Sequence, residues 1–268
     1  MKSEGASISK TEDERIVAAC DALKGLADHL AELLANEKIA ADTPTQQLLA
    51  RQAVFVVRQV YGVALLVALP FYAEQAGQLV RGLAELTRII LWLDAPDDAE
   101  RQFEQAVIFW KDGIQQTRSK YEYQGSTGRQ VLPHEWEQLA NQEKLIADQE
   151  AKLGRKVGGL PNAKKMWEDL GREDLHGLFR WESDPAHGSA VTLGTVVRSN
   201  TEEHFDLGGP NQPKDRARRL GAALALLQLS GDVIVERLGR NIESWQAASS
   251  ETEAQIADLL SPLMPAAE

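Results

Sequence analysis

Cysteine is almost absent from this chain of 268 residues, and its scarcity removes several classes of site. Cys20 is the single cysteine, so the chain cannot form an internal disulfide. A zinc site built on cysteines is also excluded, because such sites use two to four thiolates. Both features are compatible with a reducing cytosol, and we expect a cytoplasmic protein.

Several familiar catalytic and nucleotide-binding signatures are missing as well. The sequence has no Gly-x-x-x-x-Gly-Lys-Ser/Thr loop, no His-Glu-x-x-His and no Gly-x-Ser-x-Gly. We therefore expect no cofactor and no metal ion. Basic residues number 29 against 40 acidic ones, a net charge of −11. This balance argues against general binding to nucleic acid, so a surface that binds RNA would have to be a local basic patch.

Uninterrupted apolar runs are short. The most apolar window, 53–73, contains Arg58, Gln59 and Pro70. These interruptions argue against a membrane span, and we expect no membrane association. A fully buried central helix explains the window better. The N-terminus, 1–5, has no apolar run behind its lysine, so we predict no signal peptide.

What the sequence does contain is helical periodicity. Apolar residues recur every three or four positions through most of the chain. Thr11 with Glu14, and Thr43 with Gln46, have the spacing of capping boxes, and Pro44 suits a first helical turn. Long helices are predicted over 11–40, 43–69, 71–93, from the turn at 94–98 to about 123, 133–154, and 213–246. Shorter helices are predicted over 162–171 and after a cap formed by Ser250 and Glu253.

These patterns predict an all-α fold, a multi-helix bundle with a small β-hairpin near 191–207, where β-branched residues gather. We divide the chain into an N-terminal helix (1–42), a helical bundle domain (43–247), and a short C-terminal helix with its tail (248–268). Within the bundle domain, 124–160 is poor in apolar residues and is expected to be a protruding helical insertion or a lid.

The most informative segment pairs Arg180 with His187, seven positions later. On a helix this spacing is about two turns, which would put both side chains on one face. Histidine moves protons near neutral pH, and arginine binds a phosphate through two parallel hydrogen bonds. Asp184-Pro185 favours a turn, and Ser183 or Asp184 would cap a helix that begins there. The structural alternative is a core histidine bonded to a backbone carbonyl, with Arg180 paired to a nearby carboxylate.

Three further groups have both a functional and a structural interpretation. Arg81 and Glu85, followed by Arg88, share a helix face and form either part of a cleft or an ordinary ion pair. Glu173 and His176 form one Glu-x-x-His, whereas a di-iron bundle needs two, so a metal site would require Glu85 or another carboxylate to converge on them. The basic cluster at 216–219 is interpreted as a solvated face rather than a recognition helix.

The segment around Arg180 and His187 resembles the signature of the HEPN superfamily of helical domains, an arginine followed after four to six residues by a histidine. The chain is also similar to an uncharacterised bacterial family of helical proteins. That family pairs an Arg-x-x-x-Glu helix, here 81–85, with an aromatic–x–Ser–x–x–x–His–Gly element, here 181–188.

The resemblance implies a metal-independent endoribonuclease of a bacterial defence or toxin–antitoxin module. Arg180 and His187 would be catalytic, with Arg81, Glu85, Ser183 and Asp184 supporting them. It also implies RNA as the substrate and a homodimer with the site at its two-fold cleft. The alternative is a non-catalytic interaction protein, a scaffold or sensor with a protein partner. Trp181 directly after the arginine, where active members have a polar residue, favours this alternative.

Overall fold

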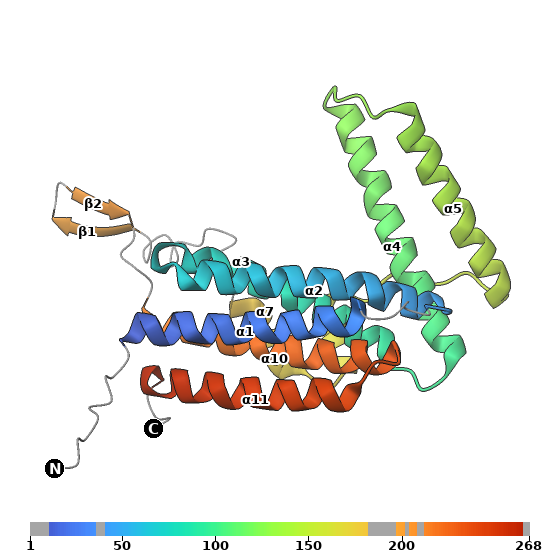
Figure 1. The fold of residues 1–268 in the computed structure, drawn as a ribbon. Coiled ribbons are helices and arrows are strands. Elements are labelled where there is room, and N and C mark those ends of the chain that lie inside the picture. The colour runs from blue at the N-terminus through green and yellow to red at the C-terminus, as the bar shows by residue number, and fades with distance from the viewer. Residues whose placement is uncertain (1–10, 36–40, 182–196, 202–203, 208–211, 265–268) are drawn as a thin grey trace, which may run out of the picture.

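A computed structural model describes residues 11–35, 41–181, 197–201, 204–207 and 212–264, with only the backbone course given for 178–181 and for the two strands (Figure 1). The expected all-α bundle is confirmed. The elements are α1 (Glu12–Ala35), α2 (Pro44–Ala68), η1 (Pro70–Tyr72), α3 (Ala73–Asp94), α4 (Ala99–Ser126), α5 (Pro133–Leu153), α6 (Ala163–Asp169), α7 (Glu173–Trp181), β1 (Val197–Thr201), β2 (His204–Leu207), α10 (Pro213–Arg237), α11 (Ile242–Leu260) and η2 (Ser261–Leu263).

Local capping signals set the starts of the first two helices, as the sequence predicted. The backbone N–H of Glu14 donates to Thr11 Oγ1 at 3.3 Å, and that of Thr11 donates to the Glu14 carboxylate at 2.7 Å. The same reciprocal box links Thr43 and Gln46, with Pro44 in the first turn of α2. Each box satisfies backbone donors that a helix leaves without internal partners.

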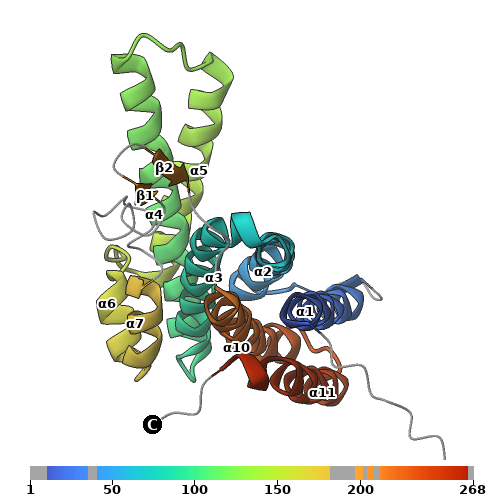
Figure 2. The same cartoon turned by 90° about the vertical axis from the view of Figure 1, so that its left-hand side faces the viewer.

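The core lies among α1, α2, α3, α10 and α11, which pack side by side (Figures 1 and 2). Their apolar stripes meet in one cluster that includes Leu23, Val60, Leu83, Leu227 and Trp245, all fully buried. Each buried aliphatic side chain of this kind contributes about 1.5–3 kcal/mol. The cluster joins helices from both ends of the chain.

The prediction for α2 is wrong in one respect, because this helix is not buried all round. Val60, Val63 and Val67 face the core, whereas Val54 and Leu65 are exposed. Among the described helices, α2 is long and apolar enough to cross a membrane, a test that core helices of soluble proteins also pass. Its apolar residues therefore supply both a core face and an outer face.

The helix predicted over 213–246 is in fact two helices. α10 ends at Arg237, and Gly239 adopts the left-handed conformation (φ 62°), which lets the N–H of Arg240 donate to Val235 O at 2.8 Å. Asn241 then caps α11 through its side chain. Consequently Ser250 and Glu253 lie inside α11 and do not cap a helix. The boundary predicted between the bundle domain (43–247) and the C-terminal helix (248–268) also falls within α11.

Helices α4 and α5 form an antiparallel arm that extends away from the bundle (Figures 1 and 2). The arm is larger than the insertion expected over 124–160, because α4 begins at Ala99. Val107, Ile146 and Val157 make a small core near its base, and the rings of Tyr121 and Trp136 meet edge to face farther out, with centroids 5.4 Å apart.

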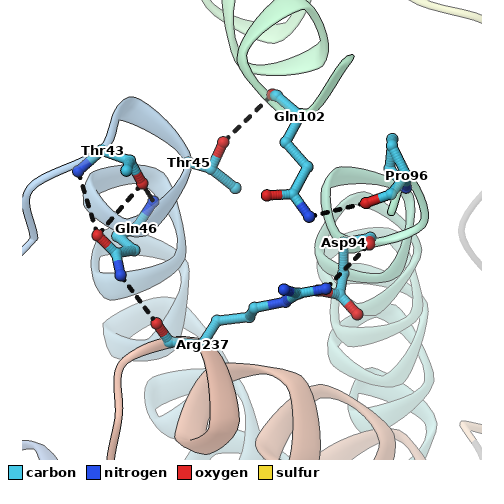
Figure 3. Close-up of polar contacts among 7 residues, drawn as sticks. All are labelled: Thr43, Thr45, Gln46, Asp94, Pro96, Gln102 and Arg237. Carbon is cyan, nitrogen blue, oxygen red and sulfur yellow. Dashed lines mark hydrogen bonds and ion pairs between the residues drawn. The ribbon is translucent and has the colours of Figure 1, made fainter. Parts of the chain in front are cut away.

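A polar junction fixes the base of the arm to the bundle (Figure 3). Thr45 Oγ1 of α2 donates to Gln102 O of α4 at 3.2 Å, and Gln46 Nε2 donates to Arg237 O of α10 at 3.1 Å. Arg237 in turn forms an ion pair with Asp94 at the end of α3. The junction therefore ties together the ends of four helices.

Strands β1 and β2 pair antiparallel within the predicted 191–207 region, with Val197 opposite Leu207 and Ser199 opposite Phe205. The first part of the predicted hairpin, 191–196, lies outside the described residues.

The basic cluster at 216–219 is not a solvated face, contrary to expectation. Arg216 and Arg219 are buried, and only Arg218 is exposed. Arg216 forms an ion pair with Asp13 of α1, and its Nε and Nη2 donate to the carbonyls of Val67 and Ala68 at 2.8 and 3.2 Å. Arg216 thus satisfies carbonyls that the C-terminus of α2 leaves without helical partners.

Candidate functional site

The polar face of α3 is the best-described part of the predicted site. Arg81 and Glu85 lie one turn apart, with Arg81 Nε 3.9 Å from Glu85 Oε1. The Arg81 side chain is 26% exposed and that of Glu85 is 47% exposed, so the pair faces solvent only in part. This separation is too long for a hydrogen bond, and the contact is an ion pair.

Arg88 extends this face by one further turn and is half-buried. Burial lowers the pKa of its guanidinium, and the neighbouring Glu85 carboxylate opposes that shift. The group stays protonated, because arginine does not lose its proton in proteins. Within the described part of the chain, Arg88 Nε is buried without a hydrogen-bond partner. Arg81, Glu85 and Arg88 together carry one net positive charge.

Helix α7 packs against α3 and against α6. Leu175 anchors α7 in the main core. Trp92, which follows Arg81 and Arg88 on the same side of α3, packs in one cluster with Met166 of α6. α6 therefore approaches α3 on the side that carries Arg81 and Arg88, and α7 packs against the same helix.

Arg180 lies in the last turn of α7, so the helix that carries it neighbours the helix that carries Arg81 and Glu85. Ser183, Asp184 and His187 lie outside the described residues. The structure thus brings together the elements that hold three of the six predicted site residues. The relation of Arg180 to His187 stays a prediction.

The metal alternative does not gain support. Among residues 11–35, 41–181 and the other described segments, no three His, Cys, Asp or Glu side chains gather as they would around a metal ion. Glu173, His176 and Glu85 are all described and do not form such a group. Nearby, Arg172 holds Asp174 through two contacts of 3.2 Å, which lower the pKa of that carboxyl.

An open cavity of about 500 Å³ lies at the end of the bundle, where α1 and α10 begin and α2 ends. Asp13, Pro70 and Arg216 are among its lining residues. Because Arg216 is engaged with Asp13 and with two backbone carbonyls, it serves to join helices here.

Sequence reasoning missed two features. The junction around Arg237 and Asp94 brings together residues 143 positions apart and has no local signature. The outer face of α2 did have a signal, namely apolar residues on every side of the helix, which was interpreted as complete burial.

Comparison with known proteins identifies a family. No curated protein and no solved structure matches the chain. Residues 46–205, more than half of the chain, match a family of unknown function, DUF5677. The match includes α2, α3, the arm and α7, and thus both the Arg81–Glu85 pair and the Arg180–His187 segment. The chain therefore belongs to the DUF5677 family of unknown function.

Proposed function

We propose that this protein is a metal-independent endoribonuclease of the HEPN type, acting in a bacterial defence or toxin–antitoxin module. Arg180 binds the scissile phosphate of an RNA. His187 moves the proton, as base toward the ribose 2′-hydroxyl or as acid toward the leaving 5′-oxygen. Support comes from one observation, the packing of α7, with Arg180 in its last turn, against α3, the helix that carries Arg81, Glu85 and Arg88.

The chemistry follows from these two groups. The 2′-oxygen forms a bond to phosphorus as the bond from phosphorus to the 5′-oxygen breaks. The proton of the 2′-hydroxyl leaves to a base, and the 5′-oxygen gains a proton. A guanidinium on the phosphate stabilises the negative charge that develops on it. The products are a 2′,3′-cyclic phosphate and a free 5′-hydroxyl.

Arg81 and Glu85 are positioning residues in this proposal. Their ion pair on α3 would orient Arg180 or His187 from the neighbouring helix. A carboxylate near an imidazole favours the protonated imidazole. Glu85→Gln is therefore expected to shift the acid limb of the pH–rate profile toward lower pH, a shift that a merely structural role would not produce.

The test is cleavage of a mixed RNA pool by the purified full chain in excess EDTA. His187→Ala and Arg180→Ala should each slow cleavage by about 100-fold or more, the usual loss when a general acid–base group is removed. His134→Ala and Arg218→Ala, at exposed positions elsewhere, are the matched controls and should cleave at the wild-type rate. Mass spectrometry should find cyclic phosphate ends.

Circular dichroism establishes that each variant is folded. A wild-type protein that leaves RNA intact, or a His187→Ala variant that retains full activity, contradicts the proposal.

A second function has its own support, that of a non-catalytic helical interaction protein. Exposed aromatic and aliphatic side chains occur on α2 and on the arm, where Tyr123 is 70% and Leu145 is 58% exposed. Apolar surface gathered in this way is typical of protein contacts. This function would leave partner binding intact in Arg180→Ala.

A further inference from the structure

The outer face of α2 is a regular stripe formed by Val54, Arg58, Tyr61 and Leu65, in which three of the four residues are apolar or aromatic. The spacing of four, three and four residues puts all of them on one side of the helix. All four side chains are exposed, with Leu65 at 63% and Val54 at 49%. A solvent-facing helix side of this kind normally carries polar residues.

The stripe belongs to a larger apolar surface. Phe55, Leu69, Phe71 and Tyr72, on α2 and just beyond it, are also exposed. A buried aromatic side chain covers about 150–250 Å², so the exposed parts of Phe55, Tyr61, Phe71 and Tyr72 alone amount to roughly 400 Å². That is already about the size of the largest apolar patch on a typical monomer, before the aliphatic residues are added. With them it approaches the roughly 800 Å² that each partner contributes to a stable interface.

The charges on and beside the stripe are complementary to each other. α2 carries Arg51 and Arg58 and no acidic residue, although the chain as a whole has a net charge of −11. Among the described residues, Arg58 forms no ion pair within the chain. Beside the stripe lies Asp28 of α1, which accepts a hydrogen bond from the hydroxyl of Tyr61. The surface therefore presents a cation, an apolar stripe and an anion.

We propose that this face binds a second copy of the chain, with the two α2 helices antiparallel and the two-fold axis between positions 58 and 61. This register sets Val54 of each copy against Leu65 of the other. It also sets Arg58 against the ring of Tyr61 and the carboxylate of Asp28 in the other copy. Val54 and Leu65 then form an apolar pair at both ends, and each Arg58 meets both an aromatic face and an anion.

A parallel arrangement of the two α2 helices would be unfavourable. A parallel pair in register would place Arg58 against Arg58, a contact between like charges. An antiparallel pair about a two-fold axis also closes on itself, so assembly stops at the dimer. The stripe lies on α2, whereas α6 and α7 lie on the other side of α3 from α2 (Figure 2). This interface differs from the two-fold cleft at the site that the resemblance implies, and the inference does not depend on RNA cleavage.

Light scattering coupled to gel filtration is the first measurement. The wild type should have twice the chain mass of 29.5 kDa at micromolar concentration. Leu65→Glu should have the mass of one chain and remain folded, because the side chain is exposed and contributes little to the core. Leu145→Glu is the matched control, a leucine of similar exposure on the arm, and should remain dimeric.

A charge exchange tests the register. Arg58→Asp alone would set aspartate against Asp28 at both ends of the interface, and Asp28→Arg alone would set two arginines together. Each variant should be mainly monomeric. Mixed in equal amounts, they should form a heterodimer with opposite charges at both ends, and native mass spectrometry of one isotope-labelled variant would identify it.

A wild type that is monomeric across the micromolar range overturns the proposal. The same holds for a dimer that Leu65→Glu leaves unchanged, or for charge variants that do not recover on mixing. The alternative occupant of such an apolar, cationic face is a membrane surface. Binding to vesicles that contain phosphatidylglycerol tests for it. A monomer that sediments with them, and loses this binding in Leu65→Glu, would replace the second copy by a membrane surface.

Discussion

Trp245 of α11 lies directly on the backbone of Gly231 in α10, and this contact joins the last two helices of the bundle. A Cβ placed on Gly231 would come within 2.1 Å of Trp245 Cζ2. The indole is fully buried, and its Nε1 donates to Asp232 Oδ1 at 2.8 Å. The close packing of this buried tryptophan thus depends on a glycine opposite it.

Gly231→Ala should therefore destabilise the protein. The added methyl would force the buried indole or the helix backbone to move, and overpacking of this kind costs about 1–3 kcal/mol. Urea unfolding followed by circular dichroism would measure the loss. Gly221→Ala in the same helix is the control: a Cβ there meets nothing within 4 Å. Because alanine favours the helix over glycine, this variant should gain up to about 1 kcal/mol. Equal effects at both positions would contradict the packing argument.

Asp232 gives the same contact a dependence on pH. Burial is the main cause that raises the pKa of this carboxyl, while the hydrogen bond from Trp245 lowers it. The folded protein therefore holds the proton more tightly than the unfolded chain, in which the carboxyl has the ordinary aspartate pKa of about 3.9. Stability contributed by the protonated group is lost as the pH rises from that value through the raised folded pKa.

Asp232→Asn should remove this loss, because its amide oxygen still accepts from the indole and carries no charge. The free energy of unfolding of Asp232→Asn relative to wild type should increase as the pH rises across the carboxyl range and then level off. Urea unfolding at several pH values would follow this difference. A difference that is constant with pH would show that the carboxyl titrates alike in both states.

The starts of the helices could be predicted because they are local. Thr43, Pro44 and Gln46 hold the information for a capping box within four residues. The end of α10 could not be predicted as safely. Its signal is Gly239, and a single glycine inside an apolar periodicity is compatible with a continuous helix until the left-handed backbone is seen.

The burial of a side chain could be predicted less well than its helical conformation, because burial depends on which other helices pack against it. The apolar sequence of α2 predicted a core helix, yet only one face found neighbours. Arg216 appeared to be a surface cation, yet it lies where three helix ends meet. For the candidate site, the sequence named the residues. Only the fold shows that α7, which carries Arg180, packs against α3, which carries Arg81 and Glu85.

Arg216 should be the most sensitive arginine of the basic cluster at 216–219 when fold stability is measured. Arg216→Met removes the donors to Val67 O and Ala68 O, and a buried carbonyl left without a partner costs about 1–3 kcal/mol. Thermal unfolding should show a large decrease in Tm. Arg218→Met, an exposed neighbour on the same helix, should change stability by less than about 0.5 kcal/mol.

Asp13→Asn separates the two roles of Arg216. The carboxylate of Asp13 is 66% exposed, so its ion pair is expected to contribute at most about 1 kcal/mol. If Asp13→Asn were as harmful as Arg216→Met, the ion pair rather than the carbonyl contacts would hold the helices together.

The base of the arm should respond to pH in the opposite direction from Asp232. Lys111 Nζ lies 2.9 Å from Glu150 Oε1 and 2.8 Å from Val157 O, and the N–H of Val157 donates to the same carboxylate at 3.0 Å. The hydrogen bond from Lys111 is the main cause that lowers the pKa of Glu150. The stability that this group contributes is therefore complete above about 4.3, the ordinary glutamate value, and is lost as the pH falls through the lowered pKa.

Because α5 packs along α4 away from the bundle, this loss should appear as local opening of the arm. Amide hydrogen exchange should show protection falling over 133–153 at acid pH before it falls in α2 or α10. Glu150→Gln should reduce that protection at neutral pH and abolish its acid dependence. Glu143→Gln removes a more exposed partner, of Arg118, and should have a smaller effect. If protection were instead lost together in α5 and in the bundle, the arm would unfold as one unit with the core, and Lys111 and Glu150 would not control its opening.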